Sequence, residues 1–398
     1  MNRLSFPEYY NVYKVLRSDF RNSRSQNMVT KLEVEFAAKI NCQYSLAFTN
    51  GTATLHTALE ALGIGVGDEV IVPPLTMAAT CFSVLQAGAL PVFADVDRET
   101  GQISASSIEK SLSSRTKAIM TVALYGGCPD YQEIIKLAPG IPIIEDNAEA
   151  FGCRYYGEHI GNIGVFSSYS LQTSKHLTAG EGGLLCTNDE ELANKARRIQ
   201  SLGYAAVGAN KFKISKKDIQ HPDYERHVQL GWNYRMSELV AAVARGQVAR
   251  SQKLVNLRIS YAKKFQEVAK GSRILTPLKN HQGVDSSFWA IPFVLDINRV
   301  TWENFRDVYL SQGGKGIYAA WKLNYDEPVF RSLSFMGREK LLTVKQKEYL
   351  LSVKCENAEF LQPRLLAFRS NEWNALQQRT QLKALRRTLE ILEKGYDF

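Results

Sequence analysis

The strongest constraint on the fold is an alternation of short apolar runs with stretches of helical periodicity between about residues 30 and 185. The apolar runs are rich in β-branched residues, and most close at Pro, Gly or Asp; they are SLAFT, EVIVPP, PVFADV, AIMTVAL and IPIIED. Between them, stretches such as TLHTALEAL place their apolar residues on one helical face. Strands that alternate with helices predict βαβ units around a buried, mostly parallel sheet, and therefore an α/β fold.

The chain of 398 residues is long enough for two domains. From SELVAAVARGQVARSQKLVNLRISYAKKFQEVA onward the pattern predicts a helix continuous over many turns, of the kind that carries a chain from one domain into the next. We expect a large domain over residues 1–250, with an N-terminal helical segment, and a small α+β domain over residues 251–398. A polar segment, residues 204–226, interrupts the regular pattern, and its length predicts a lid, a partner-contacting loop or a flexible loop.

The composition narrows the range of functions. The net charge is +9, but acidic residues follow the densest basic run, NKFKISKK, at once. This favours a solvated loop, with attraction of an anionic small molecule as the functional alternative, over a nucleic-acid surface. No apolar run approaches the roughly 18 residues of a membrane span, and the start of the chain is too polar for a secretory signal. Six scattered cysteines lack metal-ligand spacing. We expect a cytoplasmic protein with no nucleic-acid, membrane or metal partner.

The first motif with chemical content is TNGTATL, in which Gly51 and Thr52 stand where a predicted strand runs into a helix. Backbone N–H groups at a helix start bind anions, because the helix dipole lies behind them. The structural alternative is an ordinary turn capped by Asn50 or Thr52. The sequence has no GxxxxGK[ST] motif, and GIGVG follows a helix instead of opening one. The two most familiar nucleotide fingerprints are therefore missing.

Two further motifs carry ionisable groups. IPIIEDNAEAFG predicts a buried strand that ends in Glu145 and Asp146, at the sheet edge where α/β proteins bind ligands. An acid there can bind a metal, act as a base or hold a protonated ring nitrogen, whereas a helix N-cap is the structural alternative. SLQTSKHLTAGEGG places Lys175 among small residues that leave room for a bulky partner on its amine. Here the alternative is an exposed lysine in a flexible loop.

The order of the three motifs narrows the chemistry further. An anion cradle is followed by an acid at a strand end, and a lysine comes about 30 residues after that acid. Pyridoxal phosphate needs these three groups: the cradle for its phosphate, the acid for its pyridine nitrogen and the lysine for a Schiff base. The three signals together predict a pyridoxal-phosphate site.

At this point the chain resembles the DegT/DnrJ/EryC1/StrS family of pyridoxal-phosphate sugar aminotransferases, which have the aspartate-aminotransferase (type I) fold. The resemblance covers most of residues 30–250 and rests on five segments: NGTATLHTALEALGIGVGDEVIVPP, AGALPVFADVD, IIEDNAEAFG, SLQTSKHLTAGEGG and GWNYRMSELVAA. The last 140 or so residues match loosely, with WKLNYDEPVF similar to a family substrate loop. The resemblance implies a large domain with a mostly parallel sheet flanked by helices, plus the smaller C-terminal α+β domain.

The resemblance also implies roles for single residues. Lys175 matches the Schiff-base lysine, which doubles as the acid and base of proton transfer. Asp146 matches the partner of the pyridine nitrogen, and Ser170 a hydroxyl that binds the phosphate. The phosphate turn and its neighbour are matched by Gly51, Thr52 and Ala53. Asn233, in WNYR, matches an asparagine that reaches the phosphate across a subunit interface, which implies a homodimer with shared active sites.

Two expected cofactor contacts depart from the family pattern. Met77 stands where the family commonly has an aromatic residue stacked on the pyridine ring, and a thioether packs there without planar stacking. Glu149 stands where the family often has Gln or His against the cofactor hydroxyl. A carboxylate at this position has to share a proton or be neutralised.

The implied activity is transfer of an amino group from glutamate or glutamine to a keto-sugar or keto-cyclitol. We expect the acceptor to be nucleotide-linked or phosphorylated, which suits the positive net charge. A related sugar dehydratase is the nearest alternative, but such enzymes have histidine in place of the lysine. A non-catalytic regulator that kept the fold is the other alternative, which the joint presence of Lys175, Asp146 and Ser170 disfavours.

Overall fold

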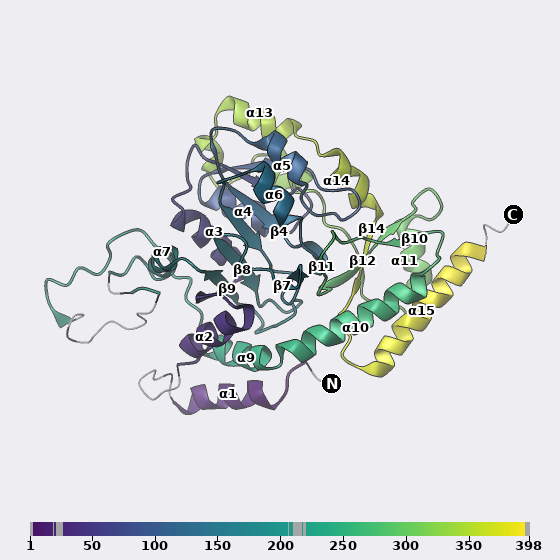
Figure 1. The fold of residues 1–398 in the computed structure, drawn as a ribbon, viewed down its shortest axis with the longest axis horizontal. Coiled ribbons are helices and arrows are strands. Elements are labelled where there is room, and N and C mark those ends of the chain that lie inside the picture. Colours follow the sequence, from purple (N-terminus) through teal and green to yellow (C-terminus); the bar gives the residue numbers. More distant parts are fainter. Residues whose placement is uncertain are drawn as a thin grey trace.

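The computed structural model describes residues 3–18, 20, 27–205, 207–209, 217 and 220–394. Its main sheet has seven strands (Figure 1), in the order β1 (Tyr44–Phe48), β9 (Gly183–Thr187), β8 (Phe166–Ser170), β5 (Ile143–Asp146), β4 (Thr116–Val122), β2 (Glu69–Val72) and β3 (Leu90–Phe93). The neighbouring strands pair in parallel except at β9, which is antiparallel to both β1 and β8. The alternation in the sequence thus predicted the strands and their buried, mostly parallel pairing.

Helices cover both faces of this sheet because its strands are apolar on both sides. One face packs against α3 (Gly51–Ala61), α4 (Ala79–Gln86) and α7 (Glu190–Gln200), through residues such as Val70 and Ile144. The other face packs against α2 (Met28–Ile40), α5 (Ala105–Ser111), α6 (Tyr131–Leu137) and α9 (Glu238–Ala249), through residues such as Ile71 and Ile143. Adjacent strand residues therefore point to opposite faces, which decides the separate roles of Glu145 and Asp146 below.

The C-terminal part has its own antiparallel sheet, in the order β10 (Leu275–Pro277), β12 (Ala290–Leu295), β14 (Leu365–Arg369) and β13 (Ile317–Ala319). Its core lies under α10 (Ser251–Ala269), α11 (Trp302–Ser311) and α15 (Ala375–Glu393). The smaller elements of this part are β11 (Val284–Asp285), α12 (Pro328–Arg331), α13 (Val344–Ser352) and α14 (Glu356–Leu361), together with the 3₁₀ turns Asn324–Asp326, Arg338–Leu341 and Gln362–Arg364. One apolar cluster runs from the main sheet into residues 320–367, so the division at residue 250 stays a prediction.

The helix expected to run without a break is interrupted at Arg250. Its φ and ψ are −109° and 7°, and it separates α9 from α10. The Arg250 guanidinium pairs with Glu8, whose carboxylate Oε1 lies 2.7 Å away and which belongs to α1 (Phe6–Arg17). The prediction of one continuous helix was therefore wrong, because a tertiary ion pair fixes the junction while the sequence there contains no proline.

A small ribbon and a loop complete the molecule. The strands β6 (Arg154–Tyr155) and β7 (Glu158–His159) pair with β11 in a three-stranded sheet, and a 3₁₀ turn spans Leu124–Gly126. Of the polar segment 204–226, residues 206, 210–216, 218 and 219 lie outside the described residues, as does most of the basic run NKFKISKK. The base of this segment is closed by hydrogen bonds from Ala205 N–H to the Arg226 carbonyl (2.9 Å) and from Val228 N–H to the Gly203 carbonyl (2.9 Å).

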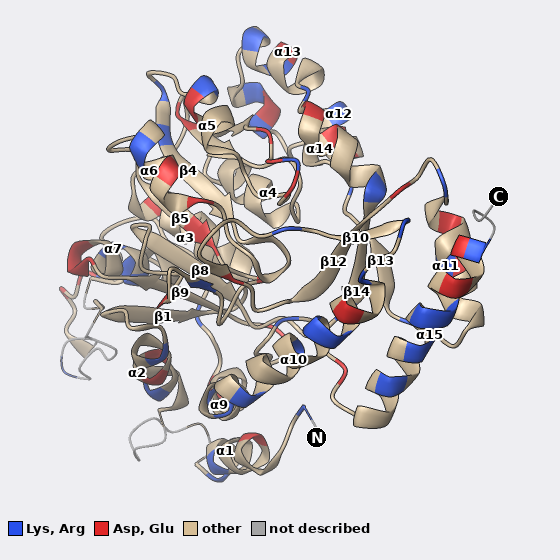
Figure 2. Cartoon of the chain, turned by 45° about the vertical axis from the view of Figure 1, so that its right-hand side comes forward, with Lys and Arg blue, Asp and Glu red and all other residues tan. Residues whose placement is uncertain are grey.

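Charged residues are distributed over many elements. Figure 2 shows basic residues on α10, α13 and α15 with acidic residues among them. In the described part of the chain, no helix combines the length and the hydropathy that a bilayer crossing needs.

Candidate active site

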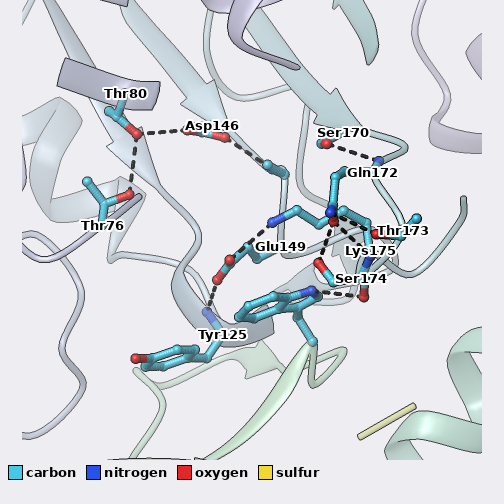
Figure 3. Close-up of polar contacts among 12 residues, drawn as sticks. Thr76, Thr80, Tyr125, Asp146, Glu149, Ser170, Gln172, Thr173, Ser174 and Lys175 are labelled. Carbon is cyan, nitrogen blue, oxygen red and sulfur yellow. Dashed lines mark hydrogen bonds and ion pairs between the residues drawn. The ribbon is translucent and has the colours of Figure 1, made fainter. Parts of the chain in front are cut away.

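Lys175 lies at the centre of the candidate site, in the loop that follows β8. Its amine donates to Glu149 Oε1 at 3.2 Å, and it stands 4.6 Å from the centre of the Trp289 ring. The lysine side chain is 13% exposed, and that of Glu149 is 5% exposed. The lysine is therefore a largely buried cation held against a carboxylate, as Figure 3 shows, and not the exposed loop residue of the structural alternative.

Glu149 joins the lysine to a strained turn. Its second carboxylate oxygen accepts a hydrogen bond from Tyr125 N–H at 3.1 Å. Tyr125 has φ = 56°, in the left-handed region that costs a non-glycine residue energy and often marks functional sites. Burial raises the pKa of Glu149, while Lys175 and the Tyr125 N–H act in the opposite direction. Glu149 thus stands where the family often has Gln or His, and in this structure the charge of Lys175 compensates its carboxylate.

Asp146 ends β5 on the side of the sheet that faces α4. Its Oδ2 accepts a hydrogen bond from Thr80 at 3.0 Å, and its Oδ1 accepts one from Ala148 N–H at 3.2 Å. The Thr80 hydroxyl lies 3.3 Å from that of Thr76, which extends the polar chain (Figure 3). Burial raises the pKa of Asp146, and its two hydrogen bonds and the charge of Lys175 only partly offset that. A buried carboxylate of this kind gains from a cationic partner.

Glu145 points to the opposite face and has a structural role. Its carboxylate accepts hydrogen bonds from the backbone N–H groups of Gly161 (2.8 Å), Ile163 (2.9 Å) and Gly164 (2.8 Å). The side-chain amide of Asn147 adds a longer contact at 3.3 Å. Of the two acids at this strand end, only Asp146 is therefore free to meet a ligand beside Lys175.

The predicted phosphate turn lies at the start of α3, beside the end of β8. Asn50 caps the helix by accepting a hydrogen bond from Ala53 N–H at 2.8 Å, so the cap alternative is realised. A Cβ on Gly51 would lie 3.2 Å from the Cβ of Ser170 and 3.6 Å from its hydroxyl. Glycine therefore keeps the helix start open toward that hydroxyl. The N–H groups of Gly51 and Thr52 precede the first intrahelical hydrogen bond and suit an anion.

The segment that carries Asn233 is fixed to α3 by side chains. Trp232 Nε1 donates to Glu60 Oε2 at 2.9 Å, and the Tyr234 hydroxyl lies 3.1 Å from His56 Nδ1. Asn233 itself is exposed between these anchors. Its predicted contact with a cofactor phosphate across an interface stays a prediction.

Met77 lies in the turn before α4. Its carbonyl accepts a hydrogen bond from Thr80 N–H at 3.2 Å, so its backbone adjoins the Asp146 contact. Its side chain is 55% exposed. The ring contact expected of this residue likewise stays a prediction.

Sequence reasoning missed three residues of the site, namely Thr80, Trp289 and Arg258, the last of which donates to the Lys175 carbonyl at 2.9 Å. Nothing in the sequence around Thr80 or Trp289 marks them, because packing alone brings them to Asp146 and Lys175. Arg258 had a detectable signal, since an arginine occupies the apolar face of α10 between the buried residues Leu254 and Tyr261.

The arrangement fits pyridoxal phosphate. The start of α3 and the Ser170 hydroxyl form an anion cradle that a larger side chain at Gly51 would narrow. Among the described residues, Asp146 has no ion pair, so a protonated pyridine nitrogen would supply the cation that its burial calls for. Lys175 would hold the cofactor covalently from its place beside Glu149.

Comparisons with known proteins find similarity over most of the chain. A model of the DegT/DnrJ/EryC1/StrS aminotransferase family matches residues 7–327. A GDP-perosamine synthase of Escherichia coli O157:H7 is 35% identical over 286 residues, which are 71% of this chain and 73% of that protein. A pleiotropic regulatory protein of Geobacillus stearothermophilus is 35% identical over 274 residues, which are 67% of this chain and 69% of that protein. The X-ray structure of an aminotransferase from Psychrobacter cryohalolentis is 27% identical and superposes with a TM-score of 0.84 over 98% of both chains. The predicted fold class, the type I fold, is confirmed.

Proposed function

Since the chain belongs to the DegT/DnrJ/EryC1/StrS aminotransferase family and is a sugar aminotransferase that uses pyridoxal phosphate, we propose that it aminates a nucleotide-linked keto-sugar. The amino donor in this proposal is glutamate or glutamine. The similarity to a protein named GDP-perosamine synthase favours a GDP-linked keto-hexose as the first acceptor to test. The proposal extends to phosphorylated keto-sugars and keto-cyclitols as further classes of acceptor.

One observation supports the proposal above all others. The amine of Lys175, whose side chain is 13% exposed, lies 3.2 Å from Oε1 of the buried Glu149 and beside another buried carboxylate, Asp146 (Figure 3). Transamination needs one amine that holds the cofactor and later moves a proton, together with an acid that keeps the pyridine nitrogen protonated. Both groups stand at the carboxyl ends of neighbouring strands, where α/β proteins bind ligands.

Each side chain has a defined part in this mechanism. The bound cofactor supplies the electron sink that stabilises negative charge at the carbon losing a proton. Asp146, oriented by Thr80, would hold the proton on the pyridine nitrogen. The N–H groups at the start of α3 and the Ser170 hydroxyl would bind the phosphate. Lys175 Nζ would hold the cofactor and would be the group that accepts and returns the proton. Glu149, to which this amine donates at 3.2 Å, would orient it.

The proposal includes a homodimer. Asn233 of the partner subunit would complete the phosphate site, as the family resemblance implies. The exposure of Asn233 on a segment held rigidly against α3 supports this reading. Sedimentation of the purified protein measures the subunit number. Mixing Asn233→Ala with Lys175→Met subunits tests sharing, because mixed dimers then contain one intact site.

The test of function is a pair of half-reactions. The purified protein is titrated with pyridoxal phosphate, and the visible absorbance band of lysine-bound cofactor is followed. Glutamate or glutamine should remove the band, and the correct keto-sugar should restore it with formation of an amino sugar detectable by mass spectrometry. The acceptor panel begins with GDP-linked keto-hexoses and continues with other nucleotide-linked keto-sugars and inososes.

The same experiment separates the alternatives. A regulator without catalysis would show no loss of the band with amino donors; regulation is the role that the name of the Geobacillus relative gives to that protein. A dehydratase would consume the keto-sugar without forming an amino sugar. His176, the histidine nearest to the lysine in sequence, is turned to the Ser287 carbonyl, 3.0 Å from its Nε2, which disfavours a histidine in the lysine's role. Absence of the band from protein mixed with pyridoxal phosphate would overturn the proposal itself.

A further inference from the structure

Three consecutive backbone carbonyls, those of Thr173, Ser174 and Lys175, accept hydrogen bonds from side chains far away in the sequence. Arg3 donates through Nη1 to Thr173 and through Nη2 to Lys175, the latter at 2.6 Å. Arg258 donates through Nη2 to the carbonyls of Ser174 (3.0 Å) and Lys175 (2.9 Å). The Lys175 carbonyl is thus held by two guanidinium groups at once.

Arg258 is fully buried and has no carboxylate partner among the described residues. Its Nη1 donates to the Trp289 carbonyl (3.0 Å) and to the Ser370 hydroxyl (2.8 Å), both in the C-terminal part. Burial, and then the nearby Arg3 and Arg369, lower the pKa of Arg258. A buried cation without an anion is costly, so simple stability is a poor reason for this arginine. Its hydrogen bonds connect the lysine loop to α10 and to the residues that precede β12 and follow β14.

Arg3 reaches the same loop from the N-terminal end of the chain. Its own carbonyl accepts hydrogen bonds from Gln247 Nε2 at 3.0 Å and from Arg250 Nη2, which anchors the arm to the junction between α9 and α10. Burial, with Arg369 nearby, lowers the pKa of Arg3 to about 10, so the group remains a cation at neutral pH. Arg3 also precedes residues 7–327, the part of the chain that the family model covers.

We propose that Arg3 and Arg258 are positioning residues that hold the backbone of Lys175 in place while its amine moves. This inference rests on the proposed function. The amine must leave the cofactor and return to the same atom, so the Cα has to remain fixed while the side chain swings. The loop contains Gly180 and Gly182, both at positive φ, and glycine resists a change of backbone conformation least. The two arginines therefore add long-range hydrogen bonds to local ones such as that from Lys175 N–H to the Gln172 carbonyl (3.0 Å). Misplacing a reacting group by about 1 Å can cost roughly a hundredfold in rate.

The test compares Arg3→Met and Arg3→Lys with a control, Arg17→Met, in the full-length holoenzyme. Arg17 lies in α1, where its Nη1 donates to Tyr13 and it has no contact with the lysine loop among the described residues. We expect Arg3→Met to lower kcat of the donor half-reaction by about tenfold or more, the effect of losing charged hydrogen bonds. KM for the donor should stay unchanged, because the hydrogen bonds that Arg3 donates to the loop end on the backbone at Thr173 and Lys175 and not on the Lys175 amine. Arg3→Lys should recover part of the loss, and Arg17→Met should behave as wild type.

Hydrogen–deuterium exchange gives a readout that does not depend on activity. In apoprotein, Arg3→Met and Arg258→Lys should speed exchange of the peptide that spans residues 171–182, whereas Arg17→Met should not. Unchanged exchange in Arg3→Met would overturn the inference, whatever happens to kcat. Unchanged kcat together with faster exchange would overturn it as well, because the clamp would then have no catalytic consequence. If wild-type protein shows no cofactor band, the proposed function fails while the exchange result still reports on the clamp.

Discussion

Replacing Lys175 by Met removes the cation that Glu149 contacts while keeping an apolar stem of similar length. In the wild-type apoprotein, burial raises the pKa of both Glu149 and Asp146, and Lys175 moderates both shifts. Without the lysine the two pKa values rise further. Between the pKa of an unfolded carboxyl, about 4, and the raised pKa of the folded one, the folded protein then binds more protons than the unfolded chain. Its free energy of unfolding falls as the pH rises through that range.

The size of the effect follows from the 3.2 Å separation of Lys175 Nζ and Glu149 Oε1. Coulomb's law at an effective dielectric constant of about 20 gives an attraction of roughly 5 kcal/mol. The variant does not lose the whole of this attraction, because the Glu149 carboxylate can take up a proton instead of staying charged. Protonating a glutamate of ordinary pKa at pH 7 costs about 3.7 kcal/mol, which is the upper limit for Glu149. We therefore expect a loss of at most about 4 kcal/mol at pH 7 from this contact, growing by up to about 1.4 kcal/mol per pH unit.

Urea unfolding of apoprotein at pH 5, 6, 7 and 8 measures this slope. Lys175→Met combined with Glu149→Gln should recover most of the loss, because the unpaired acid is then absent. Lys136→Met serves as the control: its exposed pair with Glu133 should contribute about 0.5 kcal/mol or less with little change over this range. An equal loss at pH 5 and pH 8 would refute the reasoning, since it would show that packing of the lysine stem, and not its charge, stabilises the site.

Three other substitutions test neighbouring contacts. Gly51→Ala places a Cβ 3.2 Å from that of Ser170, so we expect at least several-fold weaker binding of pyridoxal phosphate with little change in apoprotein stability, measured by titration of the visible band and by urea unfolding. Thr80→Val removes the hydroxyl that donates to Asp146; the pKa of Asp146 should rise further, and cofactor affinity should fall by about 1 kcal/mol, with the largest deficit at low pH where the acid is protonated. Glu145→Gln turns one acceptor into a donor that faces backbone N–H groups. It should lower the melting temperature through a loss of about 2 kcal/mol, yet leave the position of the cofactor band unchanged.

The parts of the site that could be predicted from the sequence are those set by local pattern. Parallel strands bring their carboxyl ends to one edge, so the acid after IPII and the lysine after the next strand of the sheet are neighbours as soon as the strand pattern is recognised. The choice between Glu145 and Asp146 also follows from alternation along the strand, once it is known which face meets α4. The sequence alone could not supply that knowledge, because it depends on which helix covers which face.

The remaining contacts depend on tertiary packing. Thr80 hydrogen-bonds to Asp146 across 66 positions, and Arg3 to the Lys175 carbonyl across 172. No local periodicity encodes either pairing. The break at Arg250 also depends on a distant residue, since the Arg250 guanidinium pairs with Glu8 at a point where the sequence pattern predicts an unbroken helix. Where sequence reasoning failed, the responsible partner in each case came from a distant part of the chain.

The arrangement of Asp146, Glu149 and Lys175 affects both the ionisation of the two acids in the apoprotein and the affinity expected for the cofactor. Asp146 and Glu149 are buried with pKa values raised by desolvation, and Lys175 is the cation whose charge opposes both shifts. A pyridine nitrogen that carries a proton would pair with Asp146 and so recover the free energy that burial of this carboxylate costs. Burial of the charged Asp146 carboxylate lowers the free energy of unfolding of the apoprotein as the pH rises. Pairing with the cofactor would remove this cost and would therefore tighten cofactor binding. Glu149 decides which acid the lysine of the apoprotein contacts. With a neutral residue at this position, Lys175 would have Asp146 as its carboxylate partner, and Asp146 would already be paired. In the structure Lys175 donates to Glu149 instead, so Asp146 would be available for the ring nitrogen.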